Sequence, residues 1–264
     1  MTLNVLICTI DEGIQRVPQV LLPPADGIRW VVSMQYTDRR FVDMVPTELT
    51  SRPDLTLTLL EGRGLSRNRN NAMSKATGDI LLLADDDCRY TAEALQTVIK
   101  TYELMANADI ICFAAKTYDG MPMKTYPGNA MSYQLAVKQG YYPSSIEISM
   151  KAGLGLLFDE RFGLGSELLC AGEEDVLMKD ALVSGYKAIF MPRYIAESNA
   201  TTTGTHFIGN ARLQCTKGAT FRYVFGLSDA IWRTLKEAGW WFIHRKANPF
   251  PILYNMLRGI WILQ

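Results

Sequence analysis

The sequence lacks the features that mark several classes of protein. Its 264 residues contain only two histidines and five widely spaced cysteines, with no CxxC motif. A disulfide framework or a zinc site is therefore not expected. Basic and acidic residues balance at 27 each, so the whole chain does not carry the positive charge that nucleic-acid binding normally requires. A hydrophobic fraction of 48% excludes a disordered chain.

Signals for export and for membrane insertion are also missing. The first residues do not combine a basic start, an apolar stretch and a small-residue cleavage site, so no signal peptide is predicted. The longest apolar runs are much shorter than the roughly 18 residues that a membrane span needs. We therefore expect a cytoplasmic protein with reduced cysteines, either free or peripheral on the inner face of the cell membrane.

Short apolar runs separated by helical patterns predict the fold class. Because these runs are almost continuously apolar, they are typical of strands buried on both faces in a mainly parallel α/β sheet. The predicted strands are residues 4–7, 28–34, 55–60, 79–84, 109–113 and 187–191. We expect one domain over residues 1–219, with a functional division near residue 115 between a first part of about 1–115 and a second of about 116–219.

The C-terminal tail, residues 220–264, differs in composition from the rest of the chain. It has six basic and two acidic residues and contains four of the five tryptophans. Basic side chains interleaved with aromatic ones are typical of a helix that lies in the headgroup layer of an anionic membrane. The alternative is a helical tail packed on the domain with a solvated basic face.

The stretch from Glu61 to Tyr90 carries the first polar motif. Ser66 is placed to cap a helix that ends near Gly78, and Arg69 shares the apolar face of this helix with Ala72. A guanidinium that points inward needs an anionic partner. Arg69 is therefore expected to contact either a carboxylate or a bound phosphate.

Three aspartates, Asp85, Asp86 and Asp87, follow the predicted strand 79–84. Adjacent carboxylates raise one another's pKa, so a cation is needed to keep all of them ionised. Clustered carboxylate oxygens suit Mg²⁺ or Mn²⁺, and ligands bind at the carboxyl ends of strands in open α/β sheets. The alternative is an acidic turn that only ends the strand and caps the next helix.

A second acidic group begins a predicted helix between Gly172 and Gly185. Glu173, Glu174 and Asp175 lie at its start, where the helix dipole favours ionised carboxylates. Such a carboxylate can accept a proton from an attacking hydroxyl. Ordinary N-terminal helix charge is the alternative.

These motifs together resemble a known family. The strings are GLSRNRNNAMSKATGDILLLADDD and FDERFGLGSELLCAGEEDVLMKDALVSGYKAIFMP. In this order and spacing they resemble the inverting family 2 glycosyltransferases of the GT-A fold, and the resemblance extends from Asn4 to about Pro192. It implies a Rossmann-type α/β sandwich with a mainly parallel sheet flanked by helices, here with a helical C-terminal tail. It also implies that residues 1–219 are a catalytic domain, with a donor-binding half of about 1–115 and an acceptor-binding half of about 116–219.

The resemblance also implies roles for individual residues. Asp85 and Asp87 match the family's DXD motif, which holds Mn²⁺ or Mg²⁺ on the diphosphate of the sugar nucleotide. Asp175, preceded by Glu174, matches the general base of the x-E-D motif. Arg69 matches the arginine of an A-R-N segment, with Asn68 in place of the usual alanine. The family's glycine-bearing acceptor loop corresponds to the region of Gly153 and Gly155.

The sequence departs from the family pattern in two sites and in its tail. The D-D-G-S-x-D segment after the second strand is absent, so Gln35 and Asp38 become the candidates for contacting the base. The family's histidine after the last core strand is also absent, and His206 is the candidate metal ligand in its place, although a lone histidine is more often structural. Processive members carry a membrane-spanning tail, which is not found here. The remaining predicted donor contacts are Thr9, Asp11 and Asp86.

The predicted function is transfer of a sugar from a nucleoside diphosphate, most simply a UDP-sugar, to an acceptor hydroxyl on a glycan or lipid-linked sugar in bacterial surface polysaccharide synthesis. A nucleotidyltransferase is less compatible, because no glycine-rich loop with a lysine follows the first strand. A dinucleotide-binding oxidoreductase is disfavoured because Arg67 replaces the third glycine of GxGxxG. A non-catalytic membrane-surface scaffold is the alternative from another class.

Overall fold

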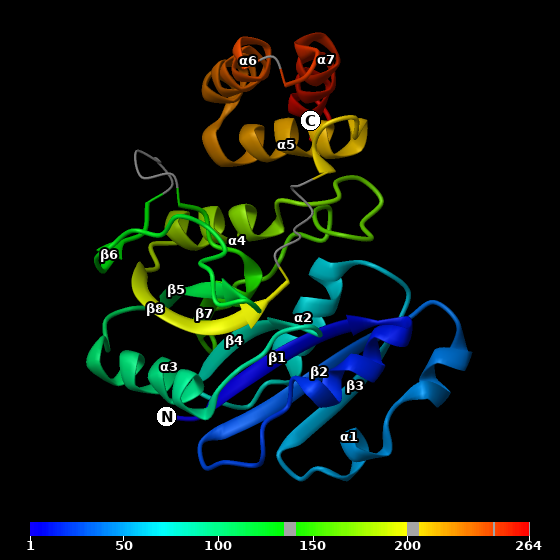
Figure 1. Cartoon of the computed structure of the whole chain (residues 1–264), viewed down its shortest axis with the longest axis vertical. Helices are drawn as coiled ribbons and strands as arrows, with labels where there is room; N and C mark the ends of the chain where they lie inside the picture. Colours follow the sequence, from blue (N-terminus) through cyan, green and yellow to red (C-terminus); the bar gives the residue numbers. More distant parts are fainter. Residues whose placement is uncertain (135–140, 200–205, 245, 264) are drawn as a thin grey trace. The chain divides into compact units, whose positions relative to one another are not determined.

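The computed structural model describes residues 1–134, 141–199, 206–244 and 246–263, and Figure 1 shows the course of the chain. The chain divides into two compact units. The first unit comprises Met1–Arg63, Arg67–Leu157 and Asp180–Ala200, and the second comprises Gly64–Ser66, Phe158–Lys179 and Thr201–Gln264. The predicted boundary between residues 219 and 220 stays a prediction; in the structure, helix α5 (Ala211–Phe225) runs through it.

The first unit is built on an eight-stranded sheet with the order β3-β2-β1-β4-β7-β5-β8-β6 in the described part of the chain. The predicted mainly parallel α/β architecture is confirmed. Each predicted strand is present and ends later than predicted, by one residue in β4 and by seven in β8. Sequence reasoning missed only the two shortest strands, β6 and β7. The strands are β1 (Leu3–Ile10), β2 (Ile28–Tyr36), β3 (Leu55–Glu61), β4 (Ile80–Asp85), β5 (Ile110–Thr117), β6 (Met131–Ser132), β7 (Ile148–Lys151) and β8 (Ala188–Ser198).

Strand β7 interrupts the parallel order at the centre of the sheet. Strands β3, β2, β1 and β4 pair in parallel, and β5 pairs in parallel with β8. Between these two parallel groups, β7 pairs antiparallel with both β4 and β5. The strand has only four residues, too few for a clear apolar pattern in the sequence. The sheet is therefore continuous only because a late segment of the chain joins its two halves.

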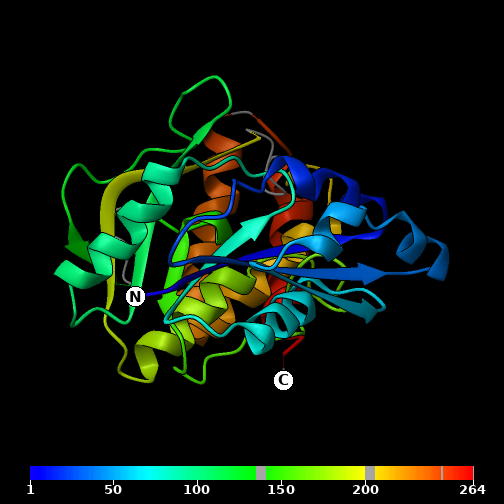
Figure 2. The same ribbon diagram turned by 90° about the horizontal axis from the view of Figure 1, so that it is seen from below.

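Helices cover the two faces of this sheet (Figure 2). On one face, α3 (Ala92–Leu104) packs Leu95, Val98 and Tyr102 into the main core with the apolar side chains of β1, β2 and β5. Thr91 caps α3 by accepting a hydrogen bond from the Ala94 N–H. The shorter elements of this unit are η1 (Asp11–Gln19), η2 (Arg39–Met44), α1 (Thr47–Ser51) and η3 (Ser145–Glu147).

Helix α2 (Leu65–Lys75) lies on the face of the sheet opposite to α3 and contacts the sheet through polar side chains. The Ser33 hydroxyl of β2 donates to Asn68 Oδ1 at 2.6 Å, and Asn71 Nδ2 donates to Ser33 Oγ at 2.8 Å. The prediction that Ser66 caps this helix is wrong. The helix begins at Leu65, and the Ser66 hydroxyl donates instead to the Phe162 carbonyl at 2.6 Å. The serine that the local sequence pattern predicts as a helix cap therefore makes its hydrogen bond to a loop far away in the chain.

The second unit contains the start of α4 (Glu173–Val183) and the helices α5, α6 (Leu227–Ile243) and α7 (Pro249–Ile260). Helices α5 and α7 approach closely because a glycine on each removes a side chain from the contact. A Cβ atom at Gly259 would lie 1.8 Å from the Cys215 carbonyl oxygen, and one at Gly218 would lie 1.9 Å from that of Met256. Across the described ranges, no helix has both the length and the apolarity to cross a bilayer.

Candidate active site

The three consecutive aspartates lie at the carboxyl end of β4, beside the carboxyl end of the parallel strand β1. Asp85 is the last residue of β4 and stands in register with Cys8 of β1. This edge of a parallel sheet is where ligands bind in open α/β folds. Each of the three carboxylates has different partners, so their charges are compensated unequally.

Asp86 is the most fully paired of the three. Arg16 Nη2 donates to its carboxylate at 2.8 Å, and the Thr9 hydroxyl donates to Asp86 Oδ2 at 2.5 Å. Hydrogen bonding to Asp86 raises the pKa of Arg16. The structure therefore brings together two predicted donor contacts, Thr9 and Asp86. Arg16 was missed because nothing in its local sequence marks it, and only the fold of η1 brings it to β4.

The carboxylate charges of Asp85 and Asp87 are balanced less closely by protein groups than the charge of Asp86. Arg69 Nη2 lies 3.5 Å from Asp85 Oδ1, and the Ser145 hydroxyl donates to Asp85 Oδ2 at 3.3 Å. The Ser198 hydroxyl of β8 donates to Asp87 Oδ1 at 3.4 Å. Burial, followed by the charges of Asp85 and Asp86, raises the pKa of Asp87. The cluster thus holds more negative charge than its protein partners balance.

Arg69 points inward, as the helical pattern predicted. Its side chain is only 3% exposed, and it faces the Asp85 carboxylate from α2. The neighbouring Asn68 explains why this position departs from the family's usual alanine. Its Nδ2 donates to the Thr9 carbonyl at 3.0 Å, which joins α2 to the carboxyl end of β1. Asn68 therefore helps to fix the position from which Arg69 reaches the cluster.

The carboxyl end of β2 carries the candidates for base recognition. Gln35 is 2% exposed, and its Nε2 has no hydrogen-bond partner among the residues that the structure describes. An unpaired buried donor is costly, so such an atom suggests a missing ligand acceptor. Asp38 is exposed instead and accepts from the Arg40 N–H at 2.9 Å. Asp11 accepts from the Thr37 N–H at 2.7 Å, which links the ends of β1 and β2.

Asp85 and Asp87 fit a divalent cation better than the third aspartate does. Asp86 already receives the Arg16 guanidinium at 2.8 Å, whereas Asp85 faces Arg69 at the longer distance of 3.5 Å and Asp87 has the Ser198 hydroxyl as its side-chain partner. Carboxylate oxygens are also the ligands that Mg²⁺ and Mn²⁺ prefer. Within the described ranges no three histidine, cysteine, aspartate or glutamate side chains are arranged as a ready metal site. His206 is exposed and belongs to the second unit.

The predicted general base lies at the start of α4, in the second unit. Glu173, Glu174 and Asp175 form the first turn of the helix, and the Val176 N–H donates to the Gly172 carbonyl at 3.1 Å. Glu173 is buried, whereas Glu174 and Asp175 are half-buried. The N-terminal end of the helix carries partial positive charge, which attracts these carboxylates. The predicted helix between Gly172 and Gly185 is confirmed.

Gly153 and Gly155, the predicted acceptor-loop glycines, lie after β7 in the first unit. They line a cavity of about 180 Å³ together with residues of α2. The other lining residues of the cavity are Asn70, Met73, Ser74, Leu81, Met150, Lys151, Leu154, Leu156 and Leu157. The loop thus packs beside the helix that carries Arg69.

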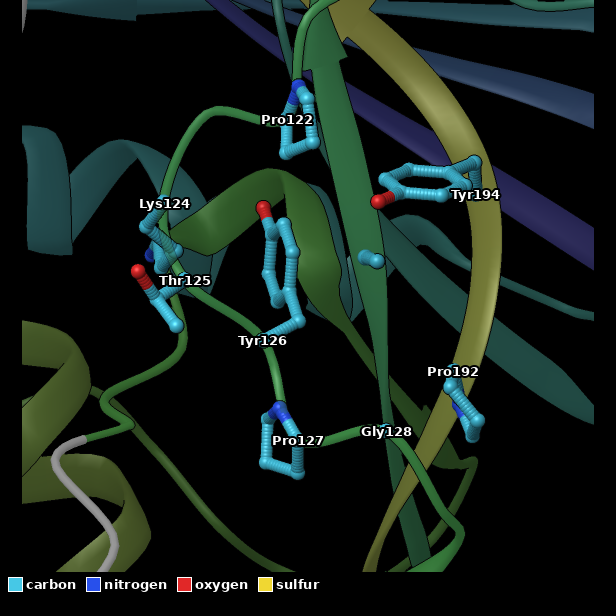
Figure 3. A pocket seen from close by; sticks show the side chains of 9 residues that line it. Pro122, Lys124, Thr125, Tyr126, Pro127, Gly128, Pro192 and Tyr194 are labelled. Carbon is cyan, nitrogen blue, oxygen red and sulfur yellow. The ribbon is translucent and has the colours of Figure 1, made fainter.

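An aromatic pocket of about 630 Å³ opens beside β5 and β8 (Figure 3). The register between the two strands shifts twice near Ala114, and this irregularity accompanies Pro192 and Tyr194 on β8. The rings of Tyr194 and Tyr126 form two of its walls in Figure 3, 6.0 Å apart between centroids and nearly perpendicular. Their faces and the surrounding proline rings offer flat surfaces on which the C–H face of a sugar can pack.

A buried carboxylate fixes the loop that forms this pocket. Glu147 of η3 is fully buried and accepts from the Tyr126 hydroxyl at 2.6 Å and from Lys124 Nζ at 3.1 Å. The Ser144 N–H donates to the same carboxylate at 2.9 Å. No local pattern indicates this network, because its members come from separate irregular segments. The pocket wall is therefore held in place by one buried carboxylate.

The sheet order and the helical layers are those of the GT-A fold. Residues 39–155 match the model of glycosyl transferase family 2, the family that the sequence motifs resemble. The matched region contains Arg69 and the aspartate cluster and ends before Asp175. No curated protein matches the chain.

Solved structures of TarS from S. aureus are similar to this chain. One TarS crystal structure has a TM-score of 0.58 and 15% sequence identity, covering 91% of this chain and 44% of that one. TarS 1–349 in complex with UDP-GlcNAc has a TM-score of 0.58 and 16% identity, covering 87% and 69%. TarS 1–349 in complex with UDP has a TM-score of 0.55 and 14% identity, covering 98% and 88%. The similarity confirms the GT-A fold.

Proposed function

We propose that this protein is an inverting glycosyltransferase that moves a sugar from a nucleoside diphosphate to an acceptor hydroxyl. The observation that carries the proposal is the unequal compensation of the aspartate cluster. Asp86 is paired with Arg16 at 2.8 Å and Asp85 faces Arg69 at 3.5 Å, whereas among the described residues Asp87 has a hydroxyl partner, Ser198, and no basic side chain within ion-pair distance. This arrangement suits a cation and a diphosphate better than it suits an acidic turn with a purely structural role.

In this proposal the donor diphosphate lies at the aspartate cluster. Asp85 and Asp87 would hold Mn²⁺ or Mg²⁺, whose chemistry when bound is Lewis-acid stabilisation of the leaving diphosphate. Arg69 contributes a buried guanidinium beside Asp85, where it can also face a phosphate oxygen. The main contribution of the protein to catalysis is thus a fixed positive charge beside the leaving diphosphate, where negative charge develops during the reaction.

Asp175 acts in the proposal as the general base for the acceptor. Its carboxylate takes the proton from the acceptor hydroxyl as the oxygen attacks the anomeric carbon, and the bond to the diphosphate breaks in the same displacement. A single in-line displacement inverts the anomeric configuration without a covalent enzyme intermediate. Glu174, the neighbouring acid of the motif, is assigned to the same site.

We propose a uridine nucleotide as the donor, with Gln35 as the residue that contacts its base. A glutamine amide can pair with the donor and acceptor groups on the edge of uracil. The buried and unpartnered Nε2 of Gln35 supports this role. TarS 1–349, which shares the fold, has been crystallised with UDP-GlcNAc and with UDP. Thr9, Asp11 and Asp38 are assigned to the same nucleotide site.

Replacing Gln35 with methionine tests the base contact. Loss of the amide is expected to weaken UDP binding about tenfold, as for one buried hydrogen bond. In the free protein the same change removes an unpaired buried donor, so the melting temperature is expected to rise by about 2 °C or more. Calorimetry with UDP and a thermal melt without ligand measure the two effects. Unchanged UDP affinity would exclude Gln35 from the site.

Replacing Asp87 with alanine tests the cation site. The affinity for UDP in the presence of Mn²⁺ is expected to fall at least about tenfold, whereas binding measured in EDTA changes little. Asp26→Ala, which removes an exposed aspartate before the amino end of β2, is the control and should behave like the wild type. Calorimetry with and without Mn²⁺ makes the comparison. Equal metal dependence in the wild type and Asp87→Ala would contradict the assignment, and failure to bind any nucleotide would favour the scaffold alternative.

The acceptor is proposed to be a glycan or a lipid-linked sugar, as in bacterial surface polysaccharide synthesis. Contact of the C-terminal tail with the inner face of the cell membrane would place the enzyme where lipid-linked acceptors are found. The composition of the tail, with a surplus of basic residues and four tryptophans, supports this part of the proposal.

A further inference from the structure

Helix α6 is apolar on two opposite faces. Ala230, Thr234 and Ala238 are buried and follow one another at intervals of four residues, so they form the inner face. The opposite face carries an outer row of large apolar side chains: Trp232, Leu235, Phe242 and Ile243. Their spacing of three, seven and one residues places them on one side of the helix. Solvent therefore meets an apolar stripe where a surface helix normally has polar residues.

Helix α7 repeats this arrangement. Its inner side chains Ile252 and Met256 are buried in a cluster with Leu213 of α5. Its outer row is formed by Phe250 and Tyr254 and by Trp261 directly after the end of the helix, at intervals of four and seven residues. In both outer rows together, the side chains of Trp232, Phe242, Ile243, Phe250 and Tyr254 are each at least 66% exposed. Exposed apolar rows of this extent mark a binding surface.

Positive charge accompanies the outer rows. Lys236 and Lys246 are exposed, and Lys246 Nζ lies 4.7 Å from the ring centroid of Trp240. Arg258 is exposed on α7 among the residues of its outer row. Of the two acidic residues on α6, Glu237 is paired with Lys217 of α5 at 2.8 Å. The surface therefore combines large apolar side chains with cations and little opposing negative charge.

We propose that the outer rows of α6 and α7 form a docking surface for an anionic lipid bilayer, with both helices lying in the plane of the membrane. Aromatic side chains favour the interfacial region, and lysine and arginine are attracted to anionic headgroups. The inner faces remain packed on α5, so docking requires no unfolding of the unit. This proposal rests on the membrane contact in the proposed function and deepens it by naming the surface, which needs neither donor nor acceptor.

The charge on this surface distinguishes a bilayer from a second copy of the chain. A two-fold dimer would place the same patch on both sides of the contact, so the cations of one copy, Lys236, Lys246 and Arg258, would face the equally cationic patch of the other. Like charges across an interface oppose association. An anionic bilayer instead neutralises all of them while covering the apolar rows. The combination therefore fits a lipid surface better than self-association.

Vesicle sedimentation with the full chain tests this proposal. The probes are vesicles of equal parts phosphatidylglycerol and phosphatidylcholine, and vesicles of phosphatidylcholine alone. The wild type is expected to bind the anionic vesicles at least about tenfold more tightly, with weaker binding in 0.5 M salt. The double variant Trp232→Ser with Phe242→Ser should lose at least about tenfold in affinity, because two interfacial anchors are removed.

The matched control is Leu104→Ser, which replaces an apolar side chain that is 86% exposed on α3. It should bind vesicles like the wild type, and melting curves should show that all variants are folded. Absence of binding to anionic vesicles, or equal binding by the double variant, would overturn the proposal. A dimer in analytical ultracentrifugation that the double variant abolishes, without vesicle binding, would assign the surface to self-association. Because no nucleotide is present, these outcomes do not depend on the transferase assignment.

Discussion

Replacing Asp175 with asparagine is expected to lower the rate of sugar transfer by about 10²- to 10⁴-fold, the usual contribution of a general base. Asparagine keeps the shape of the side chain but cannot accept the proton of the acceptor hydroxyl. The dissociation constant of the donor should change less than about twofold, since the donor diphosphate is assigned to the aspartate cluster. Product formation from a panel of sugar nucleotides, together with calorimetry using UDP, measures both quantities.

Asp229→Asn provides a matched control for this variant. Asp229 and Asp175 are each the third residue of a helix, so both variants lose a similar helix-dipole interaction of about 0.3–1 kcal/mol. Asp229→Asn should retain normal transfer, which separates a catalytic effect from a loss of helix stability. Near-normal turnover by Asp175→Asn would remove Asp175 from the mechanism and leave the base unassigned.

Replacing Gly259 with alanine is expected to destabilise the second unit by about 3 kcal/mol or more. The added Cβ would lie 1.8 Å from the Cys215 carbonyl oxygen, a backbone atom of α5 that cannot turn aside. Helices α5 and α7 must therefore separate, which removes packing around Met256 and Leu213. Urea unfolding followed by far-UV circular dichroism measures the loss.

The control for Gly259→Ala is the same substitution at Gly239 of α6. No atom lies within 4 Å of a Cβ added there, so alanine introduces no clash. Because alanine favours a helix more than glycine does, Gly239→Ala should stabilise the protein by about 0.5–1 kcal/mol. The same chemical change is thus expected to have opposite signs at two helix positions. Equal effects at the two positions would contradict the close helix contact.

The parallel strands were predicted well because a strand that is buried on both faces consists almost entirely of apolar residues. Strands such as β1 and β4 have almost no polar interruption, so their apolar runs could be read without knowing their neighbours. The inward direction of Arg69 was predictable for a related reason. Helical periodicity placed it beside Ala72, and both are buried.

The remaining site contacts depend on tertiary structure and left no local signal. The pair formed by Arg16 and Asp86 joins residues 70 positions apart. Ser198 reaches Asp87 only because β8 runs beside β5, and Glu147 is recognisable as a structural residue only when Lys124 and Tyr126 surround it. Ser66 is a further example. Serine is a good helix-capping residue, but here its hydroxyl donates to the distant Phe162 carbonyl instead. Local propensity cannot anticipate such long-range partners.

The position of β7 has a consequence for how the nascent chain folds on the ribosome. Strands β3, β2, β1 and β4 form a contiguous parallel group from the first third of the chain, and they can assemble as soon as they emerge. Strand β5 is synthesised next but pairs with β7 and β8, both of which are made later. The free edge of β4 must therefore stay unpaired until Ile148–Lys151 arrives. Exposed strand edges invite pairing with other chains, so this interval is the period of greatest aggregation risk during synthesis.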